Sequence, residues 1–280
     1  MIIAQITDLH IGFQGKGNVC QNTPRFRTVI QSLNDMISKP DMVLLTGDLV
    51  ESGKEEDYER LKVELEKLEC PIYFGIGNHD NRESFIKNFP EARVNDGFIQ
   101  YVIEDWPLRI IVLDTLKEGF HGGEFCERRQ AWLEQTLAEK PDYPTLIAMH
   151  HPPIQTGIAW MTADEAPWVQ RFRETLRKYD NIVHIVAGHI HRTIFQKIEN
   201  TTISVCDAVA SAVGLELAPI DPNSPDNRPL ILDSNPGYSL HHWNGGMLTS
   251  HAAIASSASP LIRFDEEHTF ILHETMNEKR

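Results

Sequence analysis

The chain has 280 residues, of which 41% are hydrophobic and 24% charged, as is usual for a globular protein. Asp and Glu outnumber Lys and Arg by 40 to 26, giving a formal net charge of −14. Long nucleic acids are bound by basic patches that neutralise phosphates, so this balance argues against such a partner. No apolar run approaches the roughly 20 residues that span a bilayer, so we expect no membrane partner.

The N-terminus and the cysteines together predict a cytoplasmic protein. Residues 1–6 are too short for a signal peptide, and candidate active-site residues begin at Asp8. The scattered cysteines form no CxxC pair, which is typical of reduced thiols and not of a disulfide framework. They are Cys20, Cys70, Cys126 and Cys206.

The first two-thirds of the chain alternates short apolar runs with helical patterns, which predicts βαβ units. In chain order we expect a strand at 2–6, a helix at 25–37, a strand at 42–45, a helix at 55–68, strands at 72–76, 100–104 and 108–113, a helix at 127–137, a strand at 146–149, a helix at 168–176 and a strand at 182–186.

After Arg192 the pattern changes to β-structure. We expect a hairpin at 193–197 and 202–205, an irregular loop at 221–233, a hairpin at 238–243 and 247–253 around Asn244-Gly245-Gly246, and an edge strand at 269–272. With no repeat and no low-complexity linker, the sequence predicts a single α/β domain over 1–280. Its catalytic core would cover about 1–206, with a C-terminal β-hairpin extension.

Polar side chains follow five of the apolar strands at once. These residues are Asp8 and His10, Asp48, Asn78 with His79 and Asp80, His150 with His151, and His189 with His191. Because sites in α/β sheets form at the carboxyl ends of strands, we expect these groups to meet at one edge. Carboxylate, amide oxygen and imidazole suit Zn, Fe, Mn or Co, and the lack of thiolate argues against a structural zinc. Two divalent or transition metal ions are therefore predicted, with Asp48 as the carboxylate that bridges them.

Five motifs in this order carry a family resemblance: Asp8-x-His10, Gly47-Asp48, Gly77-Asn78-His79-Asp80, His150-His151-Pro152 and Gly188-His189-x-His191. They resemble the signature of the calcineurin-like metallophosphoesterases, and specifically the bacterial class III cyclic-nucleotide phosphodiesterase and glycerophosphodiesterase branch. The resemblance covers about residues 1–206 and extends more weakly to 260–266. It implies a four-layer αββα sandwich of two mixed sheets. It also implies one metal bound by Asp8, His10, Asp48 and His191, and another bound by Asp48, Asn78, His150 and His189.

The chain departs from that branch at residues 204–211. Relatives usually carry a Thr-Pro or Leu-Pro pair there, and some then place a substrate-facing histidine. Here Ser211 stands about where that histidine falls, so the resemblance does not fix the substrate.

Beyond the metal ligands, His79 is the predicted catalytic residue. It would contact the phosphate, as Asn78 would, and protonate the leaving oxygen; the alternative is a purely supporting hydrogen bond. Trp160 and Met161 either form an apolar rim for the leaving group or belong to an ordinary packed loop. Asp80 is expected to cap the following helix or to orient a ligand. Structural roles are favoured for Asp114, His151 and His184, and His121 lacks any supporting pattern.

Together these residues predict a metal-dependent phosphodiesterase that hydrolyses small phosphodiesters, either cyclic nucleotides such as cyclic AMP or glycerophosphodiesters. The absence of an arginine cluster to hold a dianion favours diesters. The alternatives are a promiscuous phosphomonoesterase or nuclease of the same fold, and a non-catalytic metal-binding scaffold. The apolar C-terminal hairpin predicts a homodimer or higher even homo-oligomer with residues 236–260 at the contact, away from the metal edge.

Overall fold

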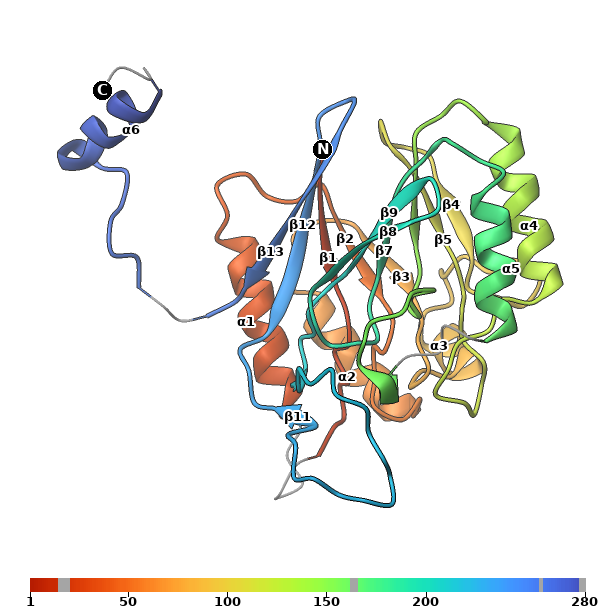
Figure 1. The fold of residues 1–280 in the computed structure, drawn as a ribbon. Helices are drawn as coiled ribbons and strands as arrows, with labels where there is room; N and C mark the ends of the chain where they lie inside the picture. The colour runs from red at the N-terminus through yellow and green to blue at the C-terminus, as the bar shows by residue number, and fades with distance from the viewer. Residues whose placement is uncertain (15–20, 162–165, 257–258, 277–280) are drawn as a thin grey trace.

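The computed structural model describes residues 1–14, 21–161, 166–256 and 259–276. Two β-sheets lie face to face, with α1 outside one sheet and α4 and α5 outside the other (Figure 1). The predicted four-layer αββα sandwich of two mixed sheets is therefore confirmed. Within the described ranges no helix is both long and apolar enough to cross a membrane.

The first sheet has the strand order β13-β12-β1-β2-β3. Its strands β1, β2 and β3 are parallel neighbours, so their carboxyl ends lie at one edge. The last hairpin extends the same sheet, because β12 pairs antiparallel with β1 on its other side. The bounds are β1 (Ile2–Ile6), β2 (Met42–Thr46), β3 (Ile72–Gly75), β12 (Gly237–Trp243) and β13 (Leu248–Ile254).

The second sheet has the order β4-β5-β6-β7-β9-β8. Strands β5, β6, β7 and β9 are parallel neighbours, while β4 and β8 run antiparallel at the two edges. The bounds are β4 (Tyr101–Ile103), β5 (Arg109–Val112), β6 (Thr145–Ala148), β7 (Ile182–Ala187), β8 (Ile194–Ile198) and β9 (Thr201–Val205). The hairpin predicted after Arg192 is thus confirmed as β8 and β9.

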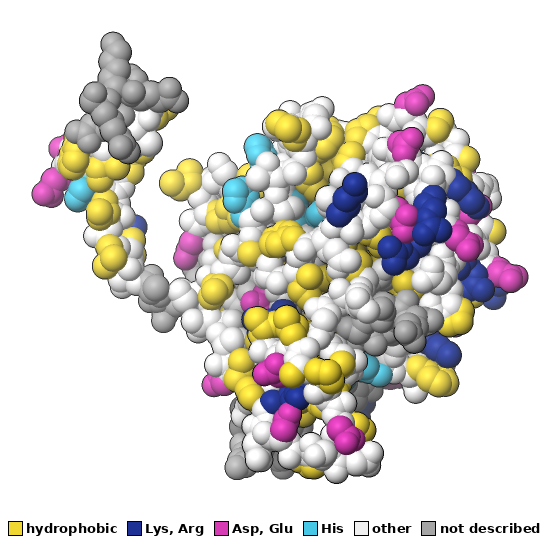
Figure 2. Space-filling model, viewed as in Figure 1, with side chains coloured by type: hydrophobic (Ala, Val, Ile, Leu, Met, Phe, Trp, Pro, Cys, Tyr) yellow, Lys and Arg dark blue, Asp and Glu magenta, His cyan; other side chains and the backbone are white. Residues whose placement is uncertain are grey.

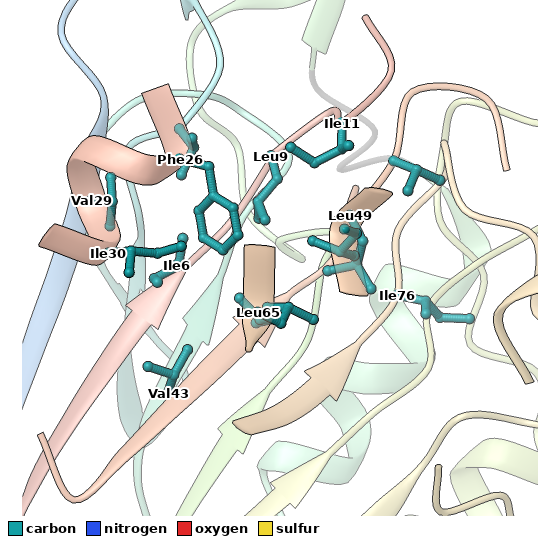
Figure 3. Close-up of a cluster of buried hydrophobic side chains, with 14 of the residues drawn as sticks. Ile6, Leu9, Ile11, Phe26, Val29, Ile30, Val43, Leu49, Leu65 and Ile76 are labelled. Carbon is teal, nitrogen blue, oxygen red and sulfur yellow. The ribbon is translucent and has the colours of Figure 1, made fainter. Parts of the chain in front are cut away.

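The main helices cover the outer faces of both sheets. They are α1 (Asn22–Asn34), α2 (Glu55–Leu65), α3 (Arg82–Asn88), α4 (Glu127–Glu139) and α5 (Pro167–Leu176). Figure 3 shows side chains of α1 and α2, among them Phe26 and Leu65, packed against Ile6 and Val43 of the first sheet. Helix α1 ends before Ile37, which the sequence placed in it, because that side chain is fully exposed and has no core to bury it.

Three local features differ from the sequence-based expectation. Residues 221–233 are mostly irregular as predicted, but β11 (Ile231–Leu232) pairs there with β10 (Ala212–Val213). A 3-10 turn, η1, covers Ala159–Met161. The edge strand predicted at 269–272 is wrong, because α6 (Thr269–Met276) follows the 3-10 turn η2 (Glu266–His268) there. A strand needs a partner strand for its backbone groups, whereas a helix satisfies them internally.

The hairpin of β12 and β13 forms as predicted, but much of its apolar surface packs on its own chain. The Trp243 backbone N–H donates to Met1 O, and its side chain is buried with Ile3 and Met42 between the sheets. Tyr238 is buried near α1, where its hydroxyl lies 2.9 Å from Ser32 Oγ. What remains exposed is the far side, strand β13, which forms the edge of the sheet.

Candidate metal centre

The loops that follow the parallel strands are tied to one another by backbone hydrogen bonds. Asp8 N donates to Gly47 O at 3.0 Å and His10 N donates to Asp48 O at 3.0 Å, which joins the exits of β1 and β2. In the second sheet Gly188 N donates to His150 O at 3.0 Å, which joins the exits of β6 and β7. The two sheets are joined at this edge by the His189 backbone N–H, which donates to Asp8 Oδ2 at 2.9 Å, so the predicted ligands of both sheets lie together.

Five of the predicted ligands have left-handed backbone conformations, which non-glycine residues rarely adopt. The φ angles are 51° at Asp8, 45° at His10, 48° at Asp48, 73° at His189 and 54° at His191. Such conformations cost free energy and persist where the surrounding structure enforces them, most often at functional sites. Five of the eight described non-glycine residues with positive φ are therefore predicted ligands.

Two glycines are required by close packing at this centre. Gly47 has a φ of 99°, and a Cβ built on it would lie 2.5 Å from His150 Nδ1. A Cβ on Gly77 would lie 2.3 Å from Asp48 Oδ1 and 2.6 Å from His150 Nε2. Any side chain at either position would occupy the space of a predicted ligand.

The first group of ligand atoms comes from Asp8, His10 and His191. His191 Nε2 lies 3.3 Å from Asp8 Oδ1 and 3.2 Å from His10 Nε2. Each ring has its other nitrogen bound to an acceptor, His10 Nδ1 to Glu51 Oε2 at 2.7 Å and His191 Nδ1 to Ser211 O at 2.8 Å. The Nδ1 atoms must therefore carry the hydrogens, and two Nε2 lone pairs face each other. A cation between them removes that repulsion.

The second group of ligand atoms surrounds His150. Its Nδ1 donates to Thr46 O at 2.8 Å, so its Nε2 lone pair faces Asn78 Oδ1 at 3.3 Å and Asp48 Oδ2 at 3.2 Å. The same Asp48 oxygen lies 3.6 Å from His10 Nε2, so Asp48 stands between the two groups. The His189 ring packs 5.2 Å from the His150 ring, centroid to centroid.

Without a cation, only bound protons could offset the repulsion between these acceptor atoms. Burial by itself lowers the pKa of His150 and His191, but Asp48 and Asp8 respectively outweigh it and raise both values to about 9. Burial by itself raises the pKa of Asp8 and Asp48, but the neighbouring histidines outweigh it and hold both values below the ordinary range. A buried set of carboxylates and imidazoles that needs positive charge fits a divalent metal site.

His79 lies beside this centre and is oriented by Glu51. Its Nδ1 donates to Glu51 O at 2.8 Å, and Glu51 Oε2 lies 3.8 Å from the same nitrogen. The His79 backbone N–H donates to Asp48 Oδ1 at 2.8 Å. With Nδ1 held in this way, Nε2 is the nitrogen left for a substrate.

Two residues at the centre were not singled out from the sequence. Glu51 contacts both His10 and His79. It follows Asp48 by three residues in the loop after β2, and this position in the sequence could have identified it as a site residue. His121 Nδ1 lies 3.4 Å from Asn78 Nδ2, and its ring is 4.8 Å from the His189 ring. His121 belongs to the loop after β5, another parallel strand that ends at the same edge.

The residues favoured for structural roles are hydrogen-bonded in the interior. Asp80 accepts from Gly77 N, Leu49 N, Val50 N and Tyr58 Oη, while Asn81 and not Asp80 caps α3. Asp114 forms two hydrogen bonds with Arg82. His151 Nδ1 contacts Thr115 Oγ1, and His184 contacts Thr202 and Ser204.

A hollow of about 240 Å³ opens beside the ligands. Its lining includes His10, His79 and His191 of the site together with Trp160 and Met161. The two residues that the sequence offered as a rim for the leaving group therefore lie at the site, where they contribute to an apolar wall.

Comparison with known proteins places this architecture in a family. The calcineurin-like phosphoesterase family model matches residues 1–193. A probable glycerophosphodiester phosphodiesterase from Arcobacter nitrofigilis is 30% identical, over 97% of this chain and 100% of that protein. A cyclic AMP phosphodiesterase from Escherichia coli is 26% identical, over 69% of this chain and 70% of that protein.

Solved structures show the same fold. A dimetal phosphatase from Danio rerio superposes with a TM-score of 0.61 at 14% identity, covering 91% of this chain and 99% of that one. The chain thus belongs to the calcineurin-like phosphoesterase family. With the buried His and Asp cluster as its divalent metal site, it is a metal-dependent phosphodiesterase, a phosphoric diester hydrolase.

Proposed function

We propose that the chain hydrolyses small phosphodiesters, either glycerophosphodiesters or cyclic nucleotides, at a centre of two metal ions. The relatives support both substrate classes, because the glycerophosphodiester phosphodiesterase matches nearly the whole chain and the cyclic AMP phosphodiesterase matches about two-thirds of it. The observation that carries the proposal is the pair of acceptor groups that meet at Asp48.

The proposed ligand sets follow these two groups. One ion would be held by Asp8, His10, Asp48 and His191, and the other by Asp48, Asn78, His150 and His189. The ions would be Fe, Mn, Zn or Co, the metals that suit imidazole and carboxylate together. Bound there, they supply an activated water at neutral pH and neutralise charge on the phosphate oxygens.

The side chains of this chain orient the diester and handle the proton. Asn78 and His79 would hold the phosphate between the metal ligands and the hollow. Hydrolysis forms one phosphorus–oxygen bond to the oxygen of water and breaks one to an alcohol. His79 would give the departing alkoxide its proton, a step worth about 10²–10⁴-fold in rate. The carboxylate of Glu51 places a negative charge beside the ring that must carry that proton.

A test of this proposal is Asp48→Ala, with the exposed Asp105→Ala as a matched control. Because one carboxylate would serve both ions, the variant should bind fewer metal ions per chain and lose hydrolysis of bis(p-nitrophenyl) phosphate. Metal content by elemental analysis and turnover with added Mn²⁺ provide the two readouts. Near-normal turnover in a metal-loaded Asp48→Ala protein would contradict the bridging role, while the control should match the wild type.

The rival functions make different predictions. A scaffold without catalysis would bind metal and hydrolyse nothing. A phosphomonoesterase or nuclease would prefer p-nitrophenyl phosphate or DNA over bis(p-nitrophenyl) phosphate. The net charge of −14 disfavours a nuclease, because phosphate backbones bind basic surfaces.

Two further proposals concern the setting of the enzyme. The free thiols of Cys70, Cys126 and Cys206 support a reducing compartment, the cytoplasm. The exposed edge strand β13 supports a homodimer or higher even homo-oligomer.

A further inference from the structure

The space around the metal centre divides into two hollows with different walls. Glu51, His79 and His121 line both hollows and separate them. One hollow has a volume of about 240 Å³ and the other about 410 Å³. A phosphate bound at His79 would therefore have one hollow on each side.

The smaller hollow, which we call the apolar hollow, is walled by aromatic and aliphatic side chains. They come from four separate segments and are Phe13, Trp160, Met161, Val213 and Ile231. Met161 and Val213 are buried and form the base, whereas Phe13 and Trp160 are about 40% exposed and form the rim. An apolar wall of this kind favours an aromatic or aliphatic group over a hydrated polar one.

One wall of the apolar hollow comes from the segment 210–213. Ala210 and Ser211 line the hollow with small side chains, which leaves its volume open. Arg25 fixes this segment, because its Nε donates to Val209 O at 2.7 Å and its Nη2 donates to Ala210 O at 3.1 Å. Ser211 in turn accepts from His191 Nδ1, so the segment is anchored to the metal centre.

The larger hollow, which we call the polar hollow, is lined mainly by hydrogen-bonding groups. Its own residues include Ser52, Asn78, Asn81 and Glu118. Glu118 adds an exposed carboxylate to that of Glu51, and Asp80 lines the hollow as well. Arg82 forms two hydrogen bonds with Asp114 and lies 3.6 Å from Glu118 Oε1, so it offsets part of this negative charge. Hydroxyl and amine groups suit such a surface. Neither hollow is lined by a lysine or arginine from the part of the chain that the structure describes, so an anionic group suits neither.

We propose that the two hollows receive the two alcohol arms of an unsymmetrical phosphodiester. An apolar or aromatic arm occupies the apolar hollow, and a hydroxyl- or amine-bearing arm occupies the polar hollow. The inference rests on the proposed phosphodiesterase function and adds to it which arms the site selects. It favours open-chain diesters, because a cyclic nucleotide carries both ester oxygens on one ribose and has no two separate arms. Either arm can leave as its alcohol, with the other retained on the monoester product.

The test uses three diesters with the metal-loaded enzyme: bis(glyceryl) phosphate, bis(3-phenylpropyl) phosphate and glyceryl 3-phenylpropyl phosphate. All three release aliphatic alcohols, so leaving-group ability is similar and the arms alone differ. The mixed diester should show a kcat/KM about tenfold or more above either symmetrical one, the scale on which pockets discriminate apolar groups. A symmetrical diester that matches the mixed one would overturn the inference. Failure to hydrolyse these and bis(p-nitrophenyl) phosphate as well would instead refute the phosphodiesterase function itself.

Variants separate the two hollows. Trp160→Ala should lower kcat/KM for the mixed diester about tenfold while changing bis(glyceryl) phosphate less than about twofold. Glu118→Leu should instead weaken the selection of the polar arm. The kcat/KM for bis(3-phenylpropyl) phosphate should rise relative to the kcat/KM for the mixed diester. Phe195→Ala, an exposed aromatic outside both hollows, is the matched control and should change none of the three. An equal loss on all three diesters in Trp160→Ala would assign Trp160 to structure and contradict the proposal.

Discussion

At the residue scale, three histidines of the metal centre each have one ring nitrogen bonded to an acceptor outside the centre. That bond leaves the other ring nitrogen with its lone pair free to bind a metal ion. Glu51, Thr46 O and Ser211 O accept from the Nδ1 atoms of His10, His150 and His191 respectively. Each contact fixes a tautomer and aims a lone pair at the centre, as the outer partners of metal-bound histidines do. Glu51 differs from the other two because it also contacts His79.

Replacement of Glu51 tests this double contact. Glu51→Ala should weaken metal binding and lower kcat/KM by about 10–100-fold, the usual effect of losing such a partner. Glu51→Gln should restore most of the metal affinity, because its amide oxygen still accepts from His10 Nδ1. Calorimetric metal titration measures the affinity, with the exposed Glu56→Ala as control. Unchanged metal affinity in Glu51→Ala would show that His10 does not depend on this bond.

His79→Ala separates proton transfer from metal binding. The variant should keep both metal ions, because the predicted ligand sets do not include this ring. Its kcat should fall about 10²-fold or more for diesters with alkoxide leaving groups, which need a proton. The loss should be smaller for p-nitrophenolate, which departs without one. Equal losses for both kinds of leaving group would mean that His79 positions the phosphate and does not act as an acid.

The sequence predicted the ligands that stand next to strand ends, but not the residues that complete the site from loops. Asp8, Asp48 and His189 are recognisable because motif and strand exit coincide. Whether His121 reaches Asn78 depends on the path of the loop after β5, and no local pattern encodes that path. The apolar hollow depends on segments such as 210–213 and 231, which only the folded chain brings together.

At the element scale, the periodicity and length of the apolar runs predicted which segments pack against a core. The parallel strands were found within a residue or two, because buried apolar runs between turn signals leave few alternatives. The edge strand predicted at 269–272 is wrong because so short a run, with three apolar residues after Thr269, fits a strand or a helix equally well. No described strand lies beside α6, so the helix is what satisfies the backbone groups of this segment.

The interface between the two sheets contains a polar layer that makes stability depend on pH. Burial lowers the pKa of His184 on β7 to about 4, with Thr202 Oγ1 and Ser204 Oγ as its partners. The unfolded chain, with a pKa near 6.5, binds this proton first as the pH falls. The free energy of unfolding should therefore decrease between about pH 6.5 and pH 4, by about 2 kcal/mol at pH 5 for this group.

The measurement is denaturant unfolding of metal-free protein at pH 7 and pH 5. The decrease in the free energy of unfolding between these values should be smaller in His184→Gln than in the wild type by about 2 kcal/mol. Because the other histidines titrate in both proteins, their contributions cancel in the comparison. The exposed His242→Gln should behave like the wild type. The same pH dependence in all three proteins would show that His184 does not keep its neutral form in the fold.

At the scale of the whole molecule, surface character differs from one side to the other. Figure 2 shows lysine and arginine side chains gathered over α4 and α5, and hydrophobic side chains along the arm that carries α6 away from the sheets. Leu261, Phe264 and Met276 of this arm are largely exposed. Next to it, β13 pairs with β12 on one side and with no other described strand on its outer side. Its sequence Leu248–Ile254 contains no lysine, acidic residue or proline, the features that usually protect an edge.

The last prediction concerns that edge. We expect two copies of the chain to pair through β13 around a two-fold axis, because such pairing closes an assembly and satisfies the open backbone groups of both edges.

Trp243 is unsuitable as a test site because it is buried in its own chain. Thr249→Lys with Ala252→Lys places charges on the exposed edge instead. Light scattering should show a dimer or higher even oligomer for the wild type and a lower mass for this variant. Val63→Lys, also an exposed position but on α2, should keep the wild-type mass. Leu261→Asp with Phe264→Asp tests the arm separately: dissociation by this pair alone would place the contact in the arm, and a monomeric wild type would exclude both contacts.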